Sequence, residues 1–145
     1  MKNKRKKILL CSVLTVIICL ALGYILHKNK RDSYIETQEK RIDLYFKYNL
    51  NKYDSMKIVK VEKNPMGGYF IDGYVNHNKD YYFTAYASHE DNFQFNGDIS
   101  YDPKTLKKLF KEKDPKYKWD SNQIIKKEHL DKSKYEVDPP LFFIF

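Results

Sequence analysis

Cysteine is scarce in this chain, and its placement excludes several kinds of chemistry. The sequence has two cysteines in 145 residues, Cys11 and Cys19. A spacing of eight positions suits neither a metal pair nor a disulfide within one helix. The chain beyond Cys19 has no thiol, so it contains no disulfide and no cysteine nucleophile.

Catalytic patterns are also scarce. No serine lies in a G-x-S-x-G turn, and the glycines of residues 65–68 precede a predicted strand, not the helix start of a phosphate loop. Asp72 and Asp98 are a candidate acid/base pair on one sheet face, but each adjoins a glycine and is equally well explained as a solvated carboxylate. The sequence has four histidines, and none has another possible ligand at the spacing of a metal site. They are His27, His77, His89 and His129. We therefore predict no catalytic residue, no metal and no cofactor.

Negative charge is absent from the first 26 residues, and this explains most of the formal net charge of +8. Five of the 27 Lys and Arg residues lie within residues 1–7, and the other 22 are balanced by 19 Asp and Glu residues, which leaves +3. Cations interspersed with acids are typical of a solvated surface. We expect no nucleic-acid partner.

The longest uncharged run covers residues 8–26. As a helix it would be about 28 Å long, close to the thickness of a hydrocarbon core. We predict a cytoplasmic basic segment over 1–7 and a transmembrane anchor over 8–26. Two alternatives stay open: cleavage after Gly23, disfavoured because the apolar run continues, and acylation of Cys19, disfavoured because bulky Ile18 precedes it.

The flanking charges predict the orientation of the anchor. Five cations precede the run, whereas Lys28, Lys30 and Arg31 follow it together with Asp32. The positive-inside rule places the N-terminus in the cytoplasm and the rest of the chain outside, as a single-pass protein of the cell membrane.

A charged linker is predicted over 27–32, followed by a helix that begins at Ser33 with an S-x-x-E capping pattern and ends near Asn49. One face of this helix is expected to pack on the core, with Ile35, Ile42, Tyr45, Phe46 and Asn49. The other side is expected to lie in water, with Glu39, Lys40, Arg41 and Lys47.

Period-two alternation predicts four antiparallel strands over 56–63, 69–76, 81–88 and 93–101. Val75 and Phe83 share a face only if their connection has an odd number of residues, either 77–79 or 76–80. The core face should contain Ile71, Val75, Phe83, Ala85, Ala87, Phe93, Phe95 and Ile99. The opposite face should contain Phe70, Asp72, Tyr74, Tyr82, Thr84, Tyr86, Gln94, Asn96 and Asp98.

A helical C-terminal extension is predicted over 102–145. Asp102-Pro103 resembles a helix start before Leu106, Leu109 and Phe110. The last five residues, 141–145, are apolar but too few to span a membrane. They are expected to dock on the domain, with a role as a peptide ligand as the alternative.

Three segments, "QEKRIDLYFKYNL", "VEKNPMGGYFIDGYVNHNK" and "EDNFQFNGDISY", carry a resemblance over residues 33–101. They resemble a staphylococcal-type family of small membrane-anchored or lipoprotein-like proteins, the domain of unknown function numbered 1433. The resemblance implies placement at the envelope and a cystatin-like α+β fold, with one helix packed on a four-stranded antiparallel meander. It implies no catalytic residue.

These features favour a non-catalytic interaction module at the bacterial envelope, with neutralisation of a secreted toxin or support of an envelope complex as its role. The candidate contact surface is the outward sheet face with Phe70, Tyr74, Tyr82 and Tyr86, from which lysine is missing between Phe70 and Thr84 except at the hairpin tip. Aromatic residues are enriched and lysine is depleted at interface cores, although tyrosine also suits strands by propensity alone. The alternative is a small-ligand carrier or enzyme that uses a pocket between helix and sheet.

Overall fold

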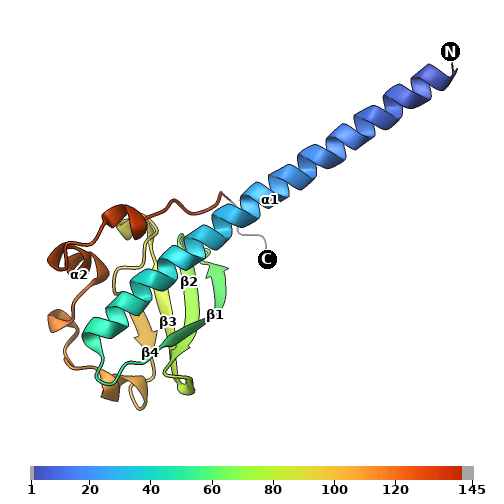
Figure 1. Ribbon diagram of the computed structural model, residues 1–145. Helices are drawn as coiled ribbons and strands as arrows, with labels where there is room; N and C mark the ends of the chain where they lie inside the picture. Colours follow the sequence, from blue (N-terminus) through green and yellow to red (C-terminus); the bar gives the residue numbers. More distant parts are fainter. Residues whose placement is uncertain (1, 142–145) are drawn as a thin grey trace.

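The computed structural model describes residues 2–141, and it begins with one long helix (Figure 1). Helix α1 (Lys2–Asn49) has 48 residues, a length of about 72 Å. Its first half extends away from the rest of the protein, and its second half lies across the sheet (Figure 1). The predicted helix start at Ser33 is therefore wrong, and residues 27–32, predicted as a linker, are helical. No proline or glycine lies between Gly23 and Pro65, and the Lys, Arg, Glu and Gln residues of this stretch favour helix.

The sheet has four antiparallel strands in the order β1-β2-β3-β4. Their bounds are β1 (Met56–Lys63), β2 (Tyr69–Val75), β3 (Asn78–Ala87) and β4 (Ile99–Tyr101). Because each strand pairs with its neighbour in sequence, the sheet is a meander. The predicted α+β architecture, one helix on a four-stranded antiparallel meander, is confirmed.

The β2–β3 hairpin has the predicted alternation of faces, but its turn differs from the predicted one. Asn76 and His77 form a two-residue turn with φ of 53° and 55°, and Val75 pairs with Asn78. The register then shifts, so that Tyr74 pairs with Tyr82 and residues 79–81 are extra. Because three is an odd number, the extra residues move the side chains that follow them to the other face of the sheet. Val75 and Phe83 therefore lie on the same face, and both are fully buried. The shared face is confirmed, but the predicted odd-numbered connection is wrong.

The fourth strand is much shorter than predicted. Of the predicted strand over 93–101, only β4 is extended and paired with β3, while Phe93 and Gly97 have positive φ. Side chains of α1 bond to the backbone of this segment instead: the Tyr34 hydroxyl donates to the Phe93 carbonyl, and the Phe95 amide donates to Gln38 Oε1 at 2.7 Å. The helix thus satisfies backbone groups that a neighbouring strand would otherwise pair.

Arg41 is fully buried in α1, so its predicted exposure to water is wrong. Its guanidinium donates three hydrogen bonds: from Nε to the Phe95 carbonyl at 2.5 Å, from Nη1 to the Tyr135 carbonyl at 3.0 Å, and from Nη2 to Asn122 Oδ1 at 2.7 Å. Burial lowers the pKa of Arg41, and the carboxylates of Glu136, Asp91 and Asp120 act in the opposite direction. Arg41 therefore ties three distant segments to α1.

Aromatic rings fill the space between α1 and the sheet. The Phe46 and Phe83 ring centroids are 4.9 Å apart, and those of Tyr45 and Phe95 are 5.4 Å apart, both in edge contacts. Except for Phe93 and Ile99, which are partly buried, the predicted core face is fully buried. Ile42, Tyr45, Phe46 and Asn49 are buried as predicted, and Ile35 is partly buried.

The segment after β4 contributes Leu106 and Phe110 to the same core. It contains the 3-10 turns η2 (Leu106–Leu109), η3 (Pro115–Tyr117) and η4 (Lys132–Lys134) and the short helix α2 (Ser121–Lys127). Leu106, Phe110, Ile124 and Ile125 are buried. The C-terminal helical content is confirmed, but the helix expected after Asp102 is only a 3-10 turn.

The docked position expected for the chain end is wrong for Leu141, which is 83% exposed. Residues 142–145 of that expectation lie outside the described residues.

Candidate interaction surface

The four predicted contact residues lie together on the outer face of the sheet. Phe70 pairs with Tyr86 across β2 and β3, with ring centroids 5.2 Å apart, and Tyr74 pairs with Tyr82. Tyr82 is 44% exposed, and the other three are half-buried. We call these four residues the tyrosine face. The alternation along each strand places them opposite the core.

Asp72 and Thr84 lie between the two aromatic pairs. The Thr84 hydroxyl donates to Asp72 Oδ1 at 2.6 Å. The pKa of Tyr82 is raised, first by burial and then by the charge of Asp72 and a hydrogen bond with it. The Asp72 carboxylate is thus already an acceptor within the sheet surface.

Asp72 and Asp98 are not brought together as an acid/base pair. Asp72 aligns with Thr84, whereas the carbonyl of Asp98 accepts from the Tyr86 amide, two residues further along β3. A separation of two strands and two residues corresponds to more than about 10 Å. The pKa of Asp98 is raised by partial burial and by the nearby carboxylates of Asp91 and Glu90.

Charged residues of the edge strand β1 border the tyrosine face. Lys57 is opposite Tyr74, and Glu62 is opposite Phe70. Lys60 Nζ lies 2.7 Å from Glu62 Oε1. An aromatic centre beside a charged margin is the usual composition of a protein-binding surface.

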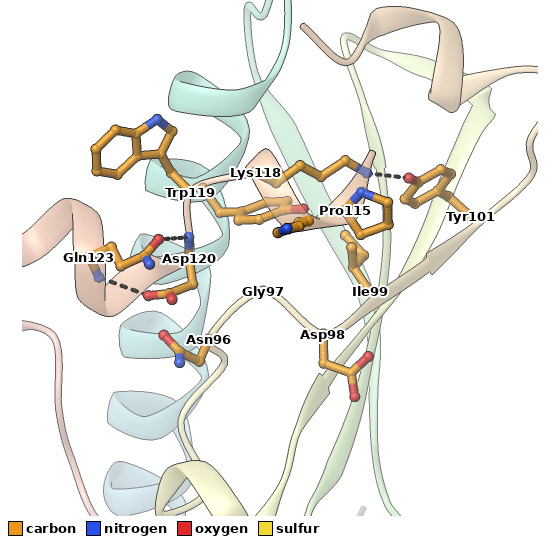
Figure 2. A pocket seen from close by; sticks show the side chains of 12 residues that line it. Asn96, Gly97, Asp98, Ile99, Tyr101, Pro115, Lys118, Trp119, Asp120 and Gln123 are labelled. Carbon is orange, nitrogen blue, oxygen red and sulfur yellow. Dashed lines mark hydrogen bonds between the residues drawn. The ribbon is translucent and has the colours of Figure 1, made fainter. Parts of the chain in front are cut away.

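A cleft of about 400 Å³ lies at the other edge of the sheet, between α1, the segment before β4 and residues 115–123 (Figure 2). Its lining includes Tyr45, Gly97, Asp98, Lys118, Trp119 and Asp120. Sequence reasoning missed this cleft because its walls come from segments far apart in the chain. The single tryptophan of the sequence, Trp119, is the residue that could have indicated it, and its side chain is 41% exposed.

Two of the charged residues in this cleft, Lys118 and Asp120, already have structural partners. Lys118 Nζ lies 3.8 Å from the Phe110 ring centroid and donates to the Tyr101 hydroxyl at 2.5 Å. The Asp120 carboxylate accepts from the Gln123 amide at 2.8 Å and caps α2 (Figure 2). These contacts hold both charged side chains in place at the wall of the cleft. Among residues 2–141, no group of three or more His, Cys, Asp or Glu residues could hold a metal ion.

The first half of α1 is long and apolar enough to cross a membrane. The helix over Asn3–Asn49 contains an 18-residue window with a mean hydropathy of 2.7, none of it buried against the rest of the protein. A signal sequence near the N-terminus would pass the same test of length and composition.

Comparison with known proteins identifies the domain. No curated protein and no solved structure matches, so the cystatin-like character implied by the resemblance stays an expectation. Residues 34–127 match a family described as a protein of unknown function, DUF1433. This confirms the resemblance for the domain itself and corrects its extent, because the match runs past Tyr101 to the end of α2. The chain therefore belongs to the DUF1433 family of proteins of unknown function.

Proposed function

We propose that this chain is a membrane-anchored, extracytoplasmic interaction module without catalytic activity. The observation that carries the proposal is the continuity of α1: its residues 8–26 are exposed and apolar, and the same helix enters the core at Tyr34. A helix without a break holds the domain at a set height and tilt above the bilayer. That geometry suits a protein that presents a binding surface to a partner outside the membrane.

The charge pattern supports the direction of insertion. Five cations precede residue 8, and three follow Leu26 close to an acid. The domain is then outside the cell, and its partner is a protein of the envelope or one that reaches it. A secreted toxin is one such partner, and neutralisation would follow from binding alone.

An alkaline phosphatase fused after Phe145 should be active, because the positive-inside rule sends the C-terminus out of the cytoplasm. Mass spectrometry of the mature protein should find an N-terminus at or next to Met1. An N-terminus at Tyr24, or an acylated Cys19, would contradict the uncleaved anchor.

The tyrosine face supports protein binding as the work of the domain. The rings of Phe70 and Tyr86 contact each other before any partner arrives, with centroids 5.2 Å apart. Tyrosine and phenylalanine side chains also have few rotatable bonds, so little side-chain entropy is lost on contact. Aromatic residues in such positions carry a large share of binding energy at protein interfaces.

Changing Tyr74, Tyr82 and Tyr86 together to serine should weaken binding of the partner found by crosslinking in intact cells by about 100-fold or more. Affinity would be measured with the full chain in detergent, alongside a melting curve. Tyr117→Ser is the control, because Tyr117 is 62% exposed but lies outside the face. Unchanged affinity in a folded triple variant would show that these tyrosines only cover the sheet and do not bind the partner.

A second candidate, a small-ligand carrier or enzyme, is favoured by one observation: the cleft of about 400 Å³ beside Trp119. Because rings fill the interface between α1 and the sheet, this cleft replaces the pocket expected there. Native mass spectrometry of the purified chain tests this candidate by detecting a retained small molecule. Its loss in the Trp119→Ala variant would assign the molecule to the cleft.

A further inference from the structure

The edge of the sheet at β4 carries unpaired backbone groups. The Tyr86 amide donates to the Asp98 carbonyl at 2.9 Å, so the Asp98 carbonyl faces β3. Backbone groups alternate in direction along a strand, and those of Ile99 and Tyr101 therefore point away from β3. Within residues 2–141, the amides and carbonyls of these two residues have no hydrogen-bond partner on that side. We call this the open edge of β4.

The other edge strand, β1, has features that oppose pairing with a further strand. The register between β1 and β2 shifts between Ile58 and Lys60. Lys57, Lys60 and Glu62 place charge along the strand. Irregular register and charged side chains are common means of protecting an edge strand from other chains. β4 pairs with β3 in a regular register, and its sequence Ile-Ser-Tyr carries no charge.

The cleft of about 400 Å³ lies along the open edge (Figure 2). Gly97, Asp98, Ile99 and Tyr101 line one side of it, and residues of the segment 115–119 line the other. β4 itself is short, but Gly97 and Asp98 extend the edge beside the cleft. The volume is within the range of ligand sites in proteins. The cleft therefore leaves space next to β4 for a segment of another chain.

The far wall of the cleft is fixed by contacts with the end of α1. The buried Asn49 side chain accepts from the Trp119 amide at 2.9 Å and donates to the Trp119 carbonyl at 2.8 Å. The Lys111 amide donates to the Asn49 carbonyl at 2.9 Å. The Trp119 backbone is thus bonded to α1 instead of to β4. The wall stays apart from the open edge, and the cleft exists before any partner arrives.

The segment that forms this wall is strongly basic. Residues 102–118 contain seven lysines and three acids, which leaves a charge of +4. In the part of the chain that the structure describes, none of these lysines forms an ion pair. Lys116 and Lys118 line the cleft, whereas Asp98 points away from Lys118 and the Asp120 carboxylate caps α2 (Figure 2). An acidic segment is therefore the complementary occupant.

We infer that an acidic, extended segment of a partner protein binds along the open edge of β4 as a fifth strand of the sheet. Its backbone pairs with the amides and carbonyls of Ile99 and Tyr101, and alternate side chains lie in the cleft near Lys116 and Trp119. Strand addition of this kind derives affinity from main-chain hydrogen bonds and selectivity from alternate side chains. This binding mode rests on the proposed function as an interaction module and adds a contact separate from the tyrosine face.

The probe for this binding mode is a phage-displayed library of random short peptides, selected on the full chain in nanodiscs. We expect the selected peptides to be rich in Asp and Glu. The tightest peptide is then synthesised, and its affinity is measured by fluorescence anisotropy. Lys116→Glu should weaken its binding by about tenfold or more, because a like charge then lines the cleft. Lys57→Glu is the control, because it makes the same change on an exposed residue at the far edge of the sheet.

Backbone pairing is tested first on the peptide, which leaves the fold of the chain undisturbed. N-methylation at one residue at a time removes one amide donor. Successive amides of a strand point to opposite sides, so binding should fall by about tenfold at alternate residues and change little between them. In the chain, Ile99→Pro removes a donor at the open edge. Ile99→Ala is its matched control, because it loses the same side chain and keeps the amide.

Selection of no peptide, or of peptides without acidic residues, would overturn the inference. Equal binding of all N-methylated peptides would show charge attraction alone and would also overturn it. The combined variant Tyr74→Ser, Tyr82→Ser and Tyr86→Ser should bind the peptide unchanged, and a loss there would place the peptide on the tyrosine face instead. If the peptide tests fail while this variant still loses the crosslinked partner, the fifth strand is wrong and the proposed function stands. If the peptide binds as expected while this variant keeps the crosslinked partner, the proposed role of the tyrosine face fails and the fifth strand stands.

Discussion

Replacing Arg41 with methionine is expected to lower the free energy of unfolding by about 3 to 5 kcal/mol. The guanidinium is fully buried and is the donor to the carbonyls of Phe95 and Tyr135 and to the Asn122 amide oxygen. Methionine fills much of the same volume but donates nothing. The Phe95 carbonyl then loses its donor in a buried place where water cannot easily replace it. The loss would also release the segment after α2 from the helix.

Urea unfolding of the full chain in detergent, followed by near-ultraviolet circular dichroism, would measure this change. Lys40→Met is the matched control, because Lys40 is the preceding residue but forms only an exposed ion pair with Glu36 at 2.8 Å. Such pairs contribute at most about 1 kcal/mol. Equal unfolding midpoints for the two variants would show that the three hydrogen bonds are not needed.

Gly68→Ala is expected to cost about 3 kcal/mol or to prevent folding of the β1–β2 hairpin. Gly68 has a φ of +83°, and a Cβ there would lie 2.2 Å from the carbonyl oxygen of Ala87. That oxygen belongs to the backbone of β3 and cannot move without breaking the sheet. The contact gives a physical reason for the second glycine of the turn sequence Asn-Pro-Met-Gly-Gly, residues 64–68.

Gly67→Ala is the matched control for steric contact. Gly67 also has a positive φ, of +103°, but a Cβ there meets nothing within 4 Å. This variant therefore carries backbone strain of about 1 to 2 kcal/mol without the collision. Thermal unfolding of both variants under identical conditions separates the two effects, and equal losses would contradict the role assigned to the close approach to Ala87.

Local patterns in the sequence determined most of the architecture. The uncharged run marked the exposed apolar part of α1, and period-two alternation placed Ile71, Val75 and Phe83 on the buried face. The same alternation brought Phe70, Tyr74, Tyr82 and Tyr86 onto one surface. These properties depend on the spacing of residues within one element, which needs no knowledge of its neighbours.

Only the tertiary structure decided the features that depend on contacts between distant segments. Arg41 looks like a solvated helix residue until the carbonyls of Phe95 and Tyr135 are packed against it. The alternating segment 93–98 looks like a strand until side chains of α1 bond to its backbone. In both places hydrogen bonds across more than 50 positions of the chain outweigh local propensity. A buried polar group must find a partner wherever the fold brings one, and sequence spacing alone does not show where that will be.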